Sequence, residues 1–346
     1  MPVHTEEQRA ALALSRVVGI GPARHAELVS RHGSAMAALD AHRDGAERRR
    51  VEAEADALLA RAAAAGARLI VRGDDAYPAR VAELHTPPAV LWMRGDGALP
   101  DAPCVAIVGT RHPTPYGELA ARDLAAALAR AGAVVVSGMA LGIDGVAHSA
   151  ALDAGAGSIG VLGTGVDIAY PRAHAALHRR LADRGLLVSE EPPGARATPG
   201  SFPKRNRIIA ALSTATIVVE ADFDSGALIT AGHALELNRA VAAVPGPIDS
   251  PRSNGTNRLL RDGAIVIAEV ADALALLGLR SAPERDLSRA SHAEKAVWKA
   301  LARGAADVDA LTASTDLPLR ECLAALTALE MLGAVECAPS GEIRRR

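Results

Sequence analysis

The chain has 346 residues, of which 49% are hydrophobic, and a formal net charge of -2 at pH 7. This length predicts about two or three domains with a sizeable core, and the near-neutral balance means that any affinity for nucleic acid must come from a local patch. No apolar stretch reaches the roughly 18 residues of a membrane span, and three widely spaced cysteines argue against a disulfide framework or a cysteine-based zinc site. We therefore expect a cytoplasmic protein with no membrane span.

Residues 1–65 are rich in alanine and in charged residues, which predicts an N-terminal helical domain. Within it, Gly19 and Gly21 permit a tight turn, and Pro22 suits the first position of the following helix. This pattern resembles a helix-hairpin-helix (or SAM-like) unit, whose turn can offer backbone N–H groups to a phosphate. A plain helix–turn–helix packing unit without a ligand explains the same pattern.

The sequence pattern changes after residue 65. Residues 66–103 contain prolines in "YP" and "TPP", and we expect an irregular, extended lead-in there. From residue 104 short apolar runs alternate with helical patterns, and each run is continuous, as in parallel strands covered on both faces. This predicts an α/β domain over residues 66–279 with a Rossmann-like, doubly wound, mostly parallel sheet. The seven runs are 104–109, 133–138, 158–163, 186–190, 216–221, 241–246 and 264–268.

The C-terminal part of the chain is predicted to be a separate winged-helix domain. Residues 280–290 are polar and predict a linker, and residues 291–346 suggest three helices followed by a two-stranded wing. The helix expected at 317–332 carries a single cation, Arg320, whereas a helix that reads base edges presents several Arg, Lys, Asn or Gln side chains. We expect that this domain is not the main DNA reader. A transcription regulator that reads DNA through it is a weaker alternative.

The chemistry is expected beyond the carboxyl ends of the strands, where ligands bind in doubly wound sheets. Gly109, Thr110 and Arg111 follow the first strand of the parallel series, and Ser137 and Gly138 follow the second. Such turns let backbone N–H groups approach an anion, although glycines also simply support tight strand-to-helix turns. No P-loop and no dinucleotide-binding glycine fingerprint occurs, so we expect no cofactor. We also expect no metal and no catalytic residues.

A concentrated positive charge occurs in the segment "FPKRNR". Lys204, Arg205 and Arg207 lie within four residues, and no Asp or Glu occurs between Glu191 and Glu220. The apolar run that follows, 208–212, anchors the segment at the core. Three cations with no intervening acid favour the binding of several phosphates, whereas a solvated helix face is the ordinary alternative. Of only seven aromatic residues (2 Phe, 3 Tyr and 2 Trp), Phe202 is the one placed to stack on a base. We therefore expect recognition mainly through phosphates, with little sequence preference.

Seven motifs, in order over roughly residues 70–275, resemble the DNA-processing protein A family, DprA, also called Smf. These are "VAIVGTRHPTPYG", "VVSGMALGIDGVAH", "VLGTGVDIAYP", "LLVSEEPPG", "FPKRNRIIAALS", "VVEADFDSGALITA" and "AVPGPIDSPRSNGTNRLLRDGA". The resemblance implies a cytoplasmic, non-catalytic single-stranded DNA-binding protein of natural transformation, or competence. Such proteins protect incoming DNA and load the RecA recombinase onto it, acting in DNA recombination as homodimers.

The family's DNA pocket uses a G-[S/T]-R turn, an S-G turn and an F-P-x-R-N-R segment. In this sequence these are Gly109, Thr110, Arg111, Ser137, Gly138, Phe202, Lys204, Asn206 and Arg207, with Arg205 as a further cation of the same segment. The chain departs from the family at Leu141, where family members often have an arginine. Either the groove lacks one cation here, or Arg111 or Arg205 supplies it.

A nucleotide-processing hydrolase with a Rossmann-like fold is the alternative function. Glu190, Glu191 and Glu220 stand at strand ends and could act as acids or hold a metal. A structural explanation is that Glu190 and Glu191 cap a turn and that Glu220 pairs with an arginine. No nucleophile–base pair is evident in the sequence, which favours the binding protein.

Overall fold

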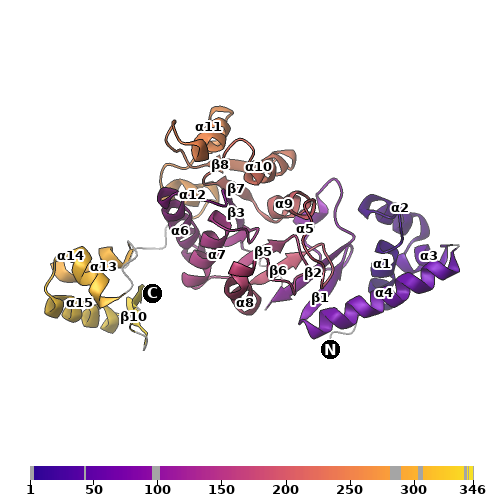
Figure 1. The fold of residues 1–346 in the computed structure, drawn as a ribbon, viewed down its shortest axis with the longest axis horizontal. Coiled ribbons are helices and arrows are strands. Elements are labelled where there is room, and N and C mark those ends of the chain that lie inside the picture. Colours follow the sequence, from indigo (N-terminus) through magenta and orange to yellow (C-terminus); the bar gives the residue numbers. More distant parts are fainter. Residues whose placement is uncertain are drawn as a thin grey trace. The chain divides into compact units, whose positions relative to one another are not determined.

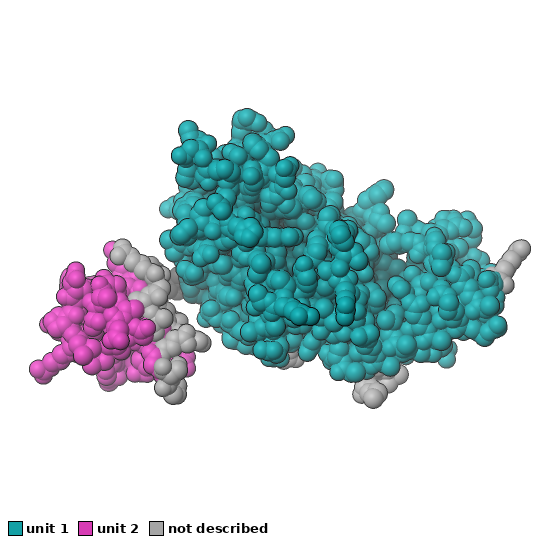
Figure 2. Space-filling view, viewed as in Figure 1, with its two compact units in different colours: residues 1–281 teal, residues 282–346 magenta. Residues whose placement is uncertain are grey.

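The computed structural model describes residues 4–42, 44–95, 102–280, 290–302, 307–338, 341 and 343–345. The chain folds into two compact units, residues 1–281 and residues 282–346 (Figure 2). No helix among the described residues is both long enough and apolar enough to cross a membrane.

The first unit begins with four helices: α1 (Glu6–Ser15), α2 (Pro22–His32), α3 (Ala35–Asp40) and α4 (Gly45–Ala64). Thr5 starts α1 with a capping box, in which its hydroxyl accepts the Gln8 N–H and the Gln8 side chain accepts the Thr5 N–H. The turn between α1 and α2 is formed as predicted. Gly19 adopts a left-handed φ of 81°, and Pro22 occupies the first turn of α2.

A nine-stranded sheet forms the centre of this unit, in the order β1-β2-β6-β5-β4-β3-β7-β8-β9 (Figure 1). Its strands are β1 (Ala67–Val71), β2 (Val90–Gly95), β3 (Cys104–Val108), β4 (Val134–Ser137), β5 (Ser158–Leu162), β6 (Leu186–Ser189), β7 (Ala215–Val218), β8 (Ala240–Ala243) and β9 (Ile265–Val266). All pairings from β3 to β9 are parallel. The predicted Rossmann-like, mostly parallel sheet is therefore confirmed, and all seven apolar runs form strands.

The expectation of an irregular lead-in at residues 66–103 is wrong. This segment contributes β1, β2 and the short helix α5 (Ala79–Ala82). β2 pairs antiparallel with β6, and β1 pairs antiparallel with β2, so the two strands extend the sheet beyond β6. The prolines that suggested irregular structure lie outside the strands, in the connection between them. β2 is a deeply buried strand, in which Leu91 and Trp92 have no solvent exposure. Burial of these large side chains outweighs the turn signals around them.

Helices cover both faces of the sheet. The helices of the core are α6 (Pro115–Arg130), α7 (Ile143–Asp153), α8 (Ala175–Arg184), α9 (Ser201–Leu212), α10 (Gly226–Glu236), α11 (Asn254–Arg261) and α12 (Val270–Leu276), with 3-10 turns η1 (Arg172–His174) and η2 (Pro251–Ser253). Helices α6, α7 and α12 pack on the face that carries Ile107, while α5, α9 and α10 pack on the face that carries Ala106 (Figure 1). Because β3 to β9 run parallel, the loops that follow them gather at their carboxyl ends, which form the sheet edge where ligands bind in such folds.

The second unit has the predicted winged-helix elements: α13 (His292–Ala302), α14 (Val308–Thr315), α15 (Leu319–Met331), and the antiparallel strands β10 (Val335–Cys337) and β11 (Ile343–Arg345). Its own small core is centred on Leu311, Cys322 and Leu329, which are fully buried. The predicted linker at 280–290 falls mainly on residues 281–289, which lie outside the described residues.

Candidate nucleic-acid interface

The turn after β3 is held from both sides by backbone hydrogen bonds. The Thr110 N–H donates to the Glu220 carbonyl oxygen at 2.7 Å, and the Thr110 carbonyl accepts the Ile143 N–H at 3.2 Å. A β-carbon on Gly109 would lie 2.7 Å from the side chain of Ile143. Glycine is therefore required here because β3 and α7 pack closely. The fixed turn leaves the Arg111 side chain exposed at the sheet edge.

The turn after β4 is built around two buried charges. Ser137 is fully buried, and its hydroxyl donates to the Ile107 carbonyl at 2.6 Å, so its side chain lies inside the sheet. The Asp144 carboxylate accepts the N–H groups of Gly138 and Ala140, at 3.1 and 3.3 Å. Burial raises the pKa of Asp144, and the positive charge of Arg205 opposes that rise. Asp144 thus positions this turn, a role that the sequence reasoning missed although the residue is visible in "GID".

Arg205 occupies the space that the missing side chain of Gly138 leaves open. Its guanidinium donates to the Gly138 carbonyl at 2.5 Å and also to the Val161 carbonyl, and the residue is only 7% exposed. A β-carbon on Gly138 would lie 2.6 Å from the guanidinium nitrogens. Burial lowers the pKa of Arg205 to about 10, so it keeps its charge at neutral pH. Arg205 is thus a buried cation that joins β4 to β5, not the solvent-facing group that the sequence suggested.

Helix α9 divides the predicted "FPKRNR" cluster between two surfaces. Phe202 and Arg205, three positions apart, line a cavity at the carboxyl ends of β4 and β5. Lys204 lines a different cavity, and Arg207 bonds to the Thr86 carbonyl at 2.8 Å. Asn206 is buried, and its amide donates to the Gly226 carbonyl, which ties α9 to α10. The segment therefore does not present three adjacent free cations.

The cavity beside Phe202 has a volume of about 80 Å³ and combines aromatic and cationic groups. The ring centroids of Tyr170 and Phe202 are 5.4 Å apart, and the Arg111 guanidinium carbon lies 5.7 Å from the Phe202 ring centroid. Gly138 and Leu141 also line it. Arg111 and Arg205 both border this space, which is where the cation replaced by Leu141 would be needed. Tyr170 was not among the predicted DNA-binding residues, although its place after β5 in "AYP" puts it at the same sheet edge.

Lys204 and Arg207 are balanced by acids, contrary to the expectation from the sequence. The Arg207 guanidinium bonds to Glu190 Oε2 at 2.6 Å, and Lys204 Nζ lies 3.3 Å from Glu190 and 3.5 Å from Glu191. Both glutamates directly follow β6, and the sheet brings that strand end beside α9. Although the sequence has no Asp or Glu between Glu191 and Glu220, acids therefore lie next to Lys204 and Arg207 in the folded protein.

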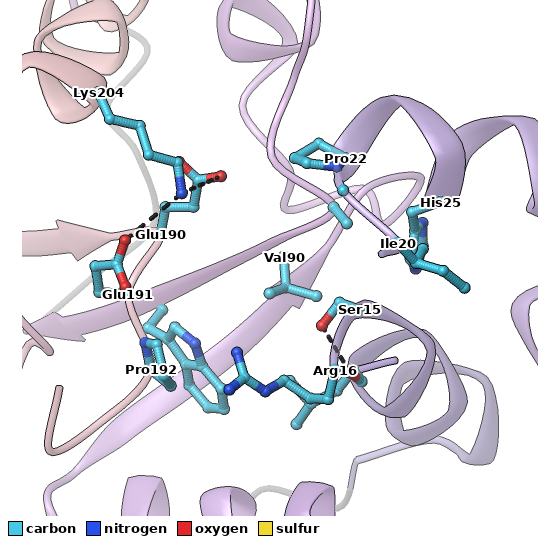
Figure 3. A pocket seen from close by; sticks show the side chains of 14 residues that line it. Ser15, Arg16, Ile20, Pro22, His25, Val90, Glu190, Glu191, Pro192 and Lys204 are labelled. Atoms are coloured by element: carbon cyan, nitrogen blue, oxygen red, sulfur yellow. Dashed lines mark hydrogen bonds and ion pairs between the residues drawn. The ribbon is translucent and has the colours of Figure 1, made fainter. Parts of the chain in front are cut away.

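A larger cavity, of about 140 Å³, lies where the N-terminal helices meet the sheet. Figure 3 shows Ser15, Arg16, Pro22 and His25 from the helical region on one side and Lys204 with Glu190 and Glu191 on the other. Trp92 also lines it, and its buried indole N–H has no hydrogen-bond partner among the described residues. Burial lowers the pKa of His25 here, which keeps its ring neutral at neutral pH.

Glu220, the remaining candidate acid, forms no ion pair with an arginine in the described part of the chain. Its carboxylate accepts the backbone N–H and the hydroxyl of Thr114, at 2.9 and 2.5 Å, and the residue is only 3% exposed. It therefore fixes the start of α6 against the end of β7. No group of three or more His, Cys, Asp or Glu that could hold a metal ion occurs among the described residues.

Known families match most of the chain, from residue 5 to residue 341. Residues 68–278 match the family "DNA recombination-mediator protein A", residues 281–341 the "DprA winged helix domain", and residues 5–65 the "DprA-like N-terminal HHH domain". The "Putative DNA processing protein DprA" of Mycobacterium tuberculosis is 42% identical over 341 residues, which cover 92% of this chain and 86% of that protein.

Two solved structures are similar as well. DNA processing protein A of Streptococcus pneumoniae has a TM-score of 0.67 at 30% identity, over 79% of this chain and 98% of that one. DNA processing protein A of Helicobacter pylori, in a structure described for its single-stranded DNA binding mode, has a TM-score of 0.56 at 34% identity, over 61% of this chain and 95% of that one. Fold, flanking domains and sequence agree, and the chain belongs to the DprA/Smf family of DNA recombination-mediator proteins.

Proposed function

We propose that this protein binds single-stranded DNA at the sheet edge that carries Arg111, Tyr170 and Phe202. The convergence of these three side chains on one cavity carries the proposal, because an aromatic pair suits an unstacked base and an exposed arginine suits its phosphate. The N-terminus of α9, which starts beside Phe202 and has no capping side chain, adds a favourable partial charge for an anion.

The DNA contacts proposed for the ten predicted residues fall into two groups. Arg111, Phe202 and Lys204 would touch the strand with their side chains, because Arg111 and Lys204 are exposed and the half-buried Phe202 lines the cavity. The others would shape the site from beneath or through their backbone: Gly109, Thr110, Ser137, Gly138, Arg205, Asn206 and Arg207. Since few aromatic residues are available, the grip would rest mainly on phosphates and depend little on sequence.

The wider role rests on family membership. We propose that the protein protects incoming single strands in natural transformation and loads RecA onto them, as a cytoplasmic homodimer. Support comes from the match to the recombination-mediator family and from the single-stranded DNA binding described for the Helicobacter pylori relative. A non-catalytic role is supported by the three candidate glutamates, each of which holds a structural partner.

A chain ending at Arg280 is expected to keep most of the single-strand affinity of the whole protein. Helix α15, the helix that would read bases, carries only one cation, Arg320, with Glu321 in its first turn, so it offers little to base edges. Fluorescence anisotropy with a labelled single strand and with a duplex of the same length tests this. Loss of binding in the shortened chain, together with tight duplex binding by residues 285–346 alone, would favour the regulator instead.

A further inference from the structure

The two glutamates that follow β6 face the only exposed cation of α9. Lys204 is half exposed, and its ammonium group lies between the two carboxylates, at 3.3 and 3.5 Å (Figure 3). Both distances exceed the usual length of a charge-assisted hydrogen bond, about 2.7–2.9 Å. The lysine is therefore attracted to the acids but not locked to them.

The Glu190 carboxylate and the backbone of Glu191 are held in place. Glu190 is bound at its other oxygen by Arg207 at 2.6 Å, and both of these side chains are largely buried. The Glu191 N–H donates to the Ser189 hydroxyl at 2.9 Å, and that hydroxyl donates to the Thr164 carbonyl at 2.7 Å. Glu190 is thus fixed by Arg207, and the backbone of Glu191 is fixed to the loop after β5, while Lys204 has the most exposed side chain of the cluster.

Arg111, which lines the other cavity, provides the contrast among the cations proposed to touch DNA. No carboxylate lies within ion-pair distance of Arg111 in the described part of the chain, whereas Lys204 has two. A DNA phosphate can approach Arg111 without displacing anything, but it must draw Lys204 away from Glu190 and Glu191. Once Lys204 leaves, Glu190 keeps Arg207, whereas Glu191 has no other ion-pair partner among the described residues.

We propose that Glu190 and Glu191 act as a built-in competitor of DNA phosphate for Lys204, and that Glu191 is the residue that sets the strength of this competition. The inference rests on the proposed single-stranded DNA binding. The acid pair would hold Lys204 in the free protein, and the lysine would transfer to a phosphate in the complex. Glu191, left unpaired, would then recruit a salt cation and offset part of the counterion release that drives binding.

Glu191→Gln is the decisive variant, because it removes the charge but keeps the size of a partly exposed side chain. We expect two- to five-fold tighter binding of a single-stranded oligonucleotide, on the order of one exposed ion pair. The slope of log K against log salt should become more negative, by up to about 0.7, the contribution of one phosphate contact. Glu190 is unsuitable for this test because its removal would also leave the largely buried Arg207 without its ion-pair partner.

Asp183→Asn is the matched control, since it changes the net charge equally. Asp183 is exposed and lies just before the start of β6, whereas Glu191 lies just after the end of that strand. We expect it to leave affinity and slope near the wild-type values. Thermal unfolding of both variants should match the wild type, which separates the proposed competition from a general change in stability.

A double-mutant cycle with Lys204→Ala identifies the cation through which Glu191 acts. In that background Glu191→Gln should no longer tighten binding or steepen the slope. A gain equal to that of Asp183→Asn, or the same gain with and without Lys204, would overturn the inference while leaving DNA binding itself intact. A wild-type protein that binds no single-stranded DNA would overturn both this inference and the proposed function.

Discussion

Replacing Gly138 with valine is expected to abolish single-stranded DNA binding and to destabilise the fold. A β-carbon at this position would lie 2.6 Å from the guanidinium of Arg205, which is wedged against the Gly138 and Val161 carbonyls. The displaced guanidinium would lose both acceptors and move into the cavity beside Phe202. We expect a loss in unfolding free energy of about 3 kcal/mol or more, the scale of leaving a buried charge without partners.

Gly232→Ala is the appropriate control, because a β-carbon there meets no atom within 4 Å. It should bind DNA normally and unfold at or slightly above the wild-type temperature, since alanine is a better helix former than glycine. DNA affinity measured well below the unfolding temperature separates the two effects in Gly138→Val. Normal affinity in a folded Gly138→Val protein would show that this turn lies away from the DNA.

The second large effect is expected for Arg111→Ala. Arg111 is exposed above the Phe202 ring and has no ion-pair partner among the described residues, so its loss removes a contact with the ligand and little else. We expect single-strand binding to weaken by about 1–3 kcal/mol, the scale of a charge-assisted hydrogen bond. The unfolding temperature should hardly change. Anisotropy titrations and thermal unfolding on the same samples measure both quantities.

Arg122→Ala controls for the loss of one positive charge. Arg122 is exposed on α6 and does not line the cavity beside Phe202. Its removal should weaken binding only slightly, through the long-range field. If the two variants lost equal affinity, Arg111 would be acting through net charge alone and the site would have to be sought elsewhere.

Most of the core was predictable because its strands are buried on both faces. Continuous apolar runs such as "VAIV" are typical of parallel strands that are buried on both faces. The glycines that directly follow two of these runs, Gly109 and Gly138, could therefore be placed at the carboxyl ends of the strands. The segments β1 and β2 were missed since the prolines between them resemble a loop, and since β6, the strand that joins β2 to the rest of the sheet, lies about a hundred residues further along the chain.

The charges were predicted less well than the strands, and α9 shows why. The sequence locates Lys204, Arg205 and Arg207 correctly near the sheet edge but does not tell which of them solvent reaches. Helical spacing alone places Phe202 and Arg205 on one side, and the depth of that side depends on the β4 and β5 carbonyls. The acids that balance Lys204 come from β6, so their proximity depends on the folded sheet.

Salt dependence of single-strand binding is the sharpest test of the proposed DNA site. Of the four predicted cations, Arg111, Lys204, Arg205 and Arg207, two have side chains exposed enough to reach phosphates: Arg111 and Lys204. Each phosphate neutralised on a single strand contributes about -0.7 to the slope of log K against log salt, so two contacts give about -1.4, and uptake of a salt cation by Glu191 would bring the wild-type slope to between about -0.7 and -1.4. Weaker binding to duplex of equal length is expected as well. A slope near zero, or tighter binding to the duplex, would contradict a phosphate-gripping single-strand site at this sheet edge.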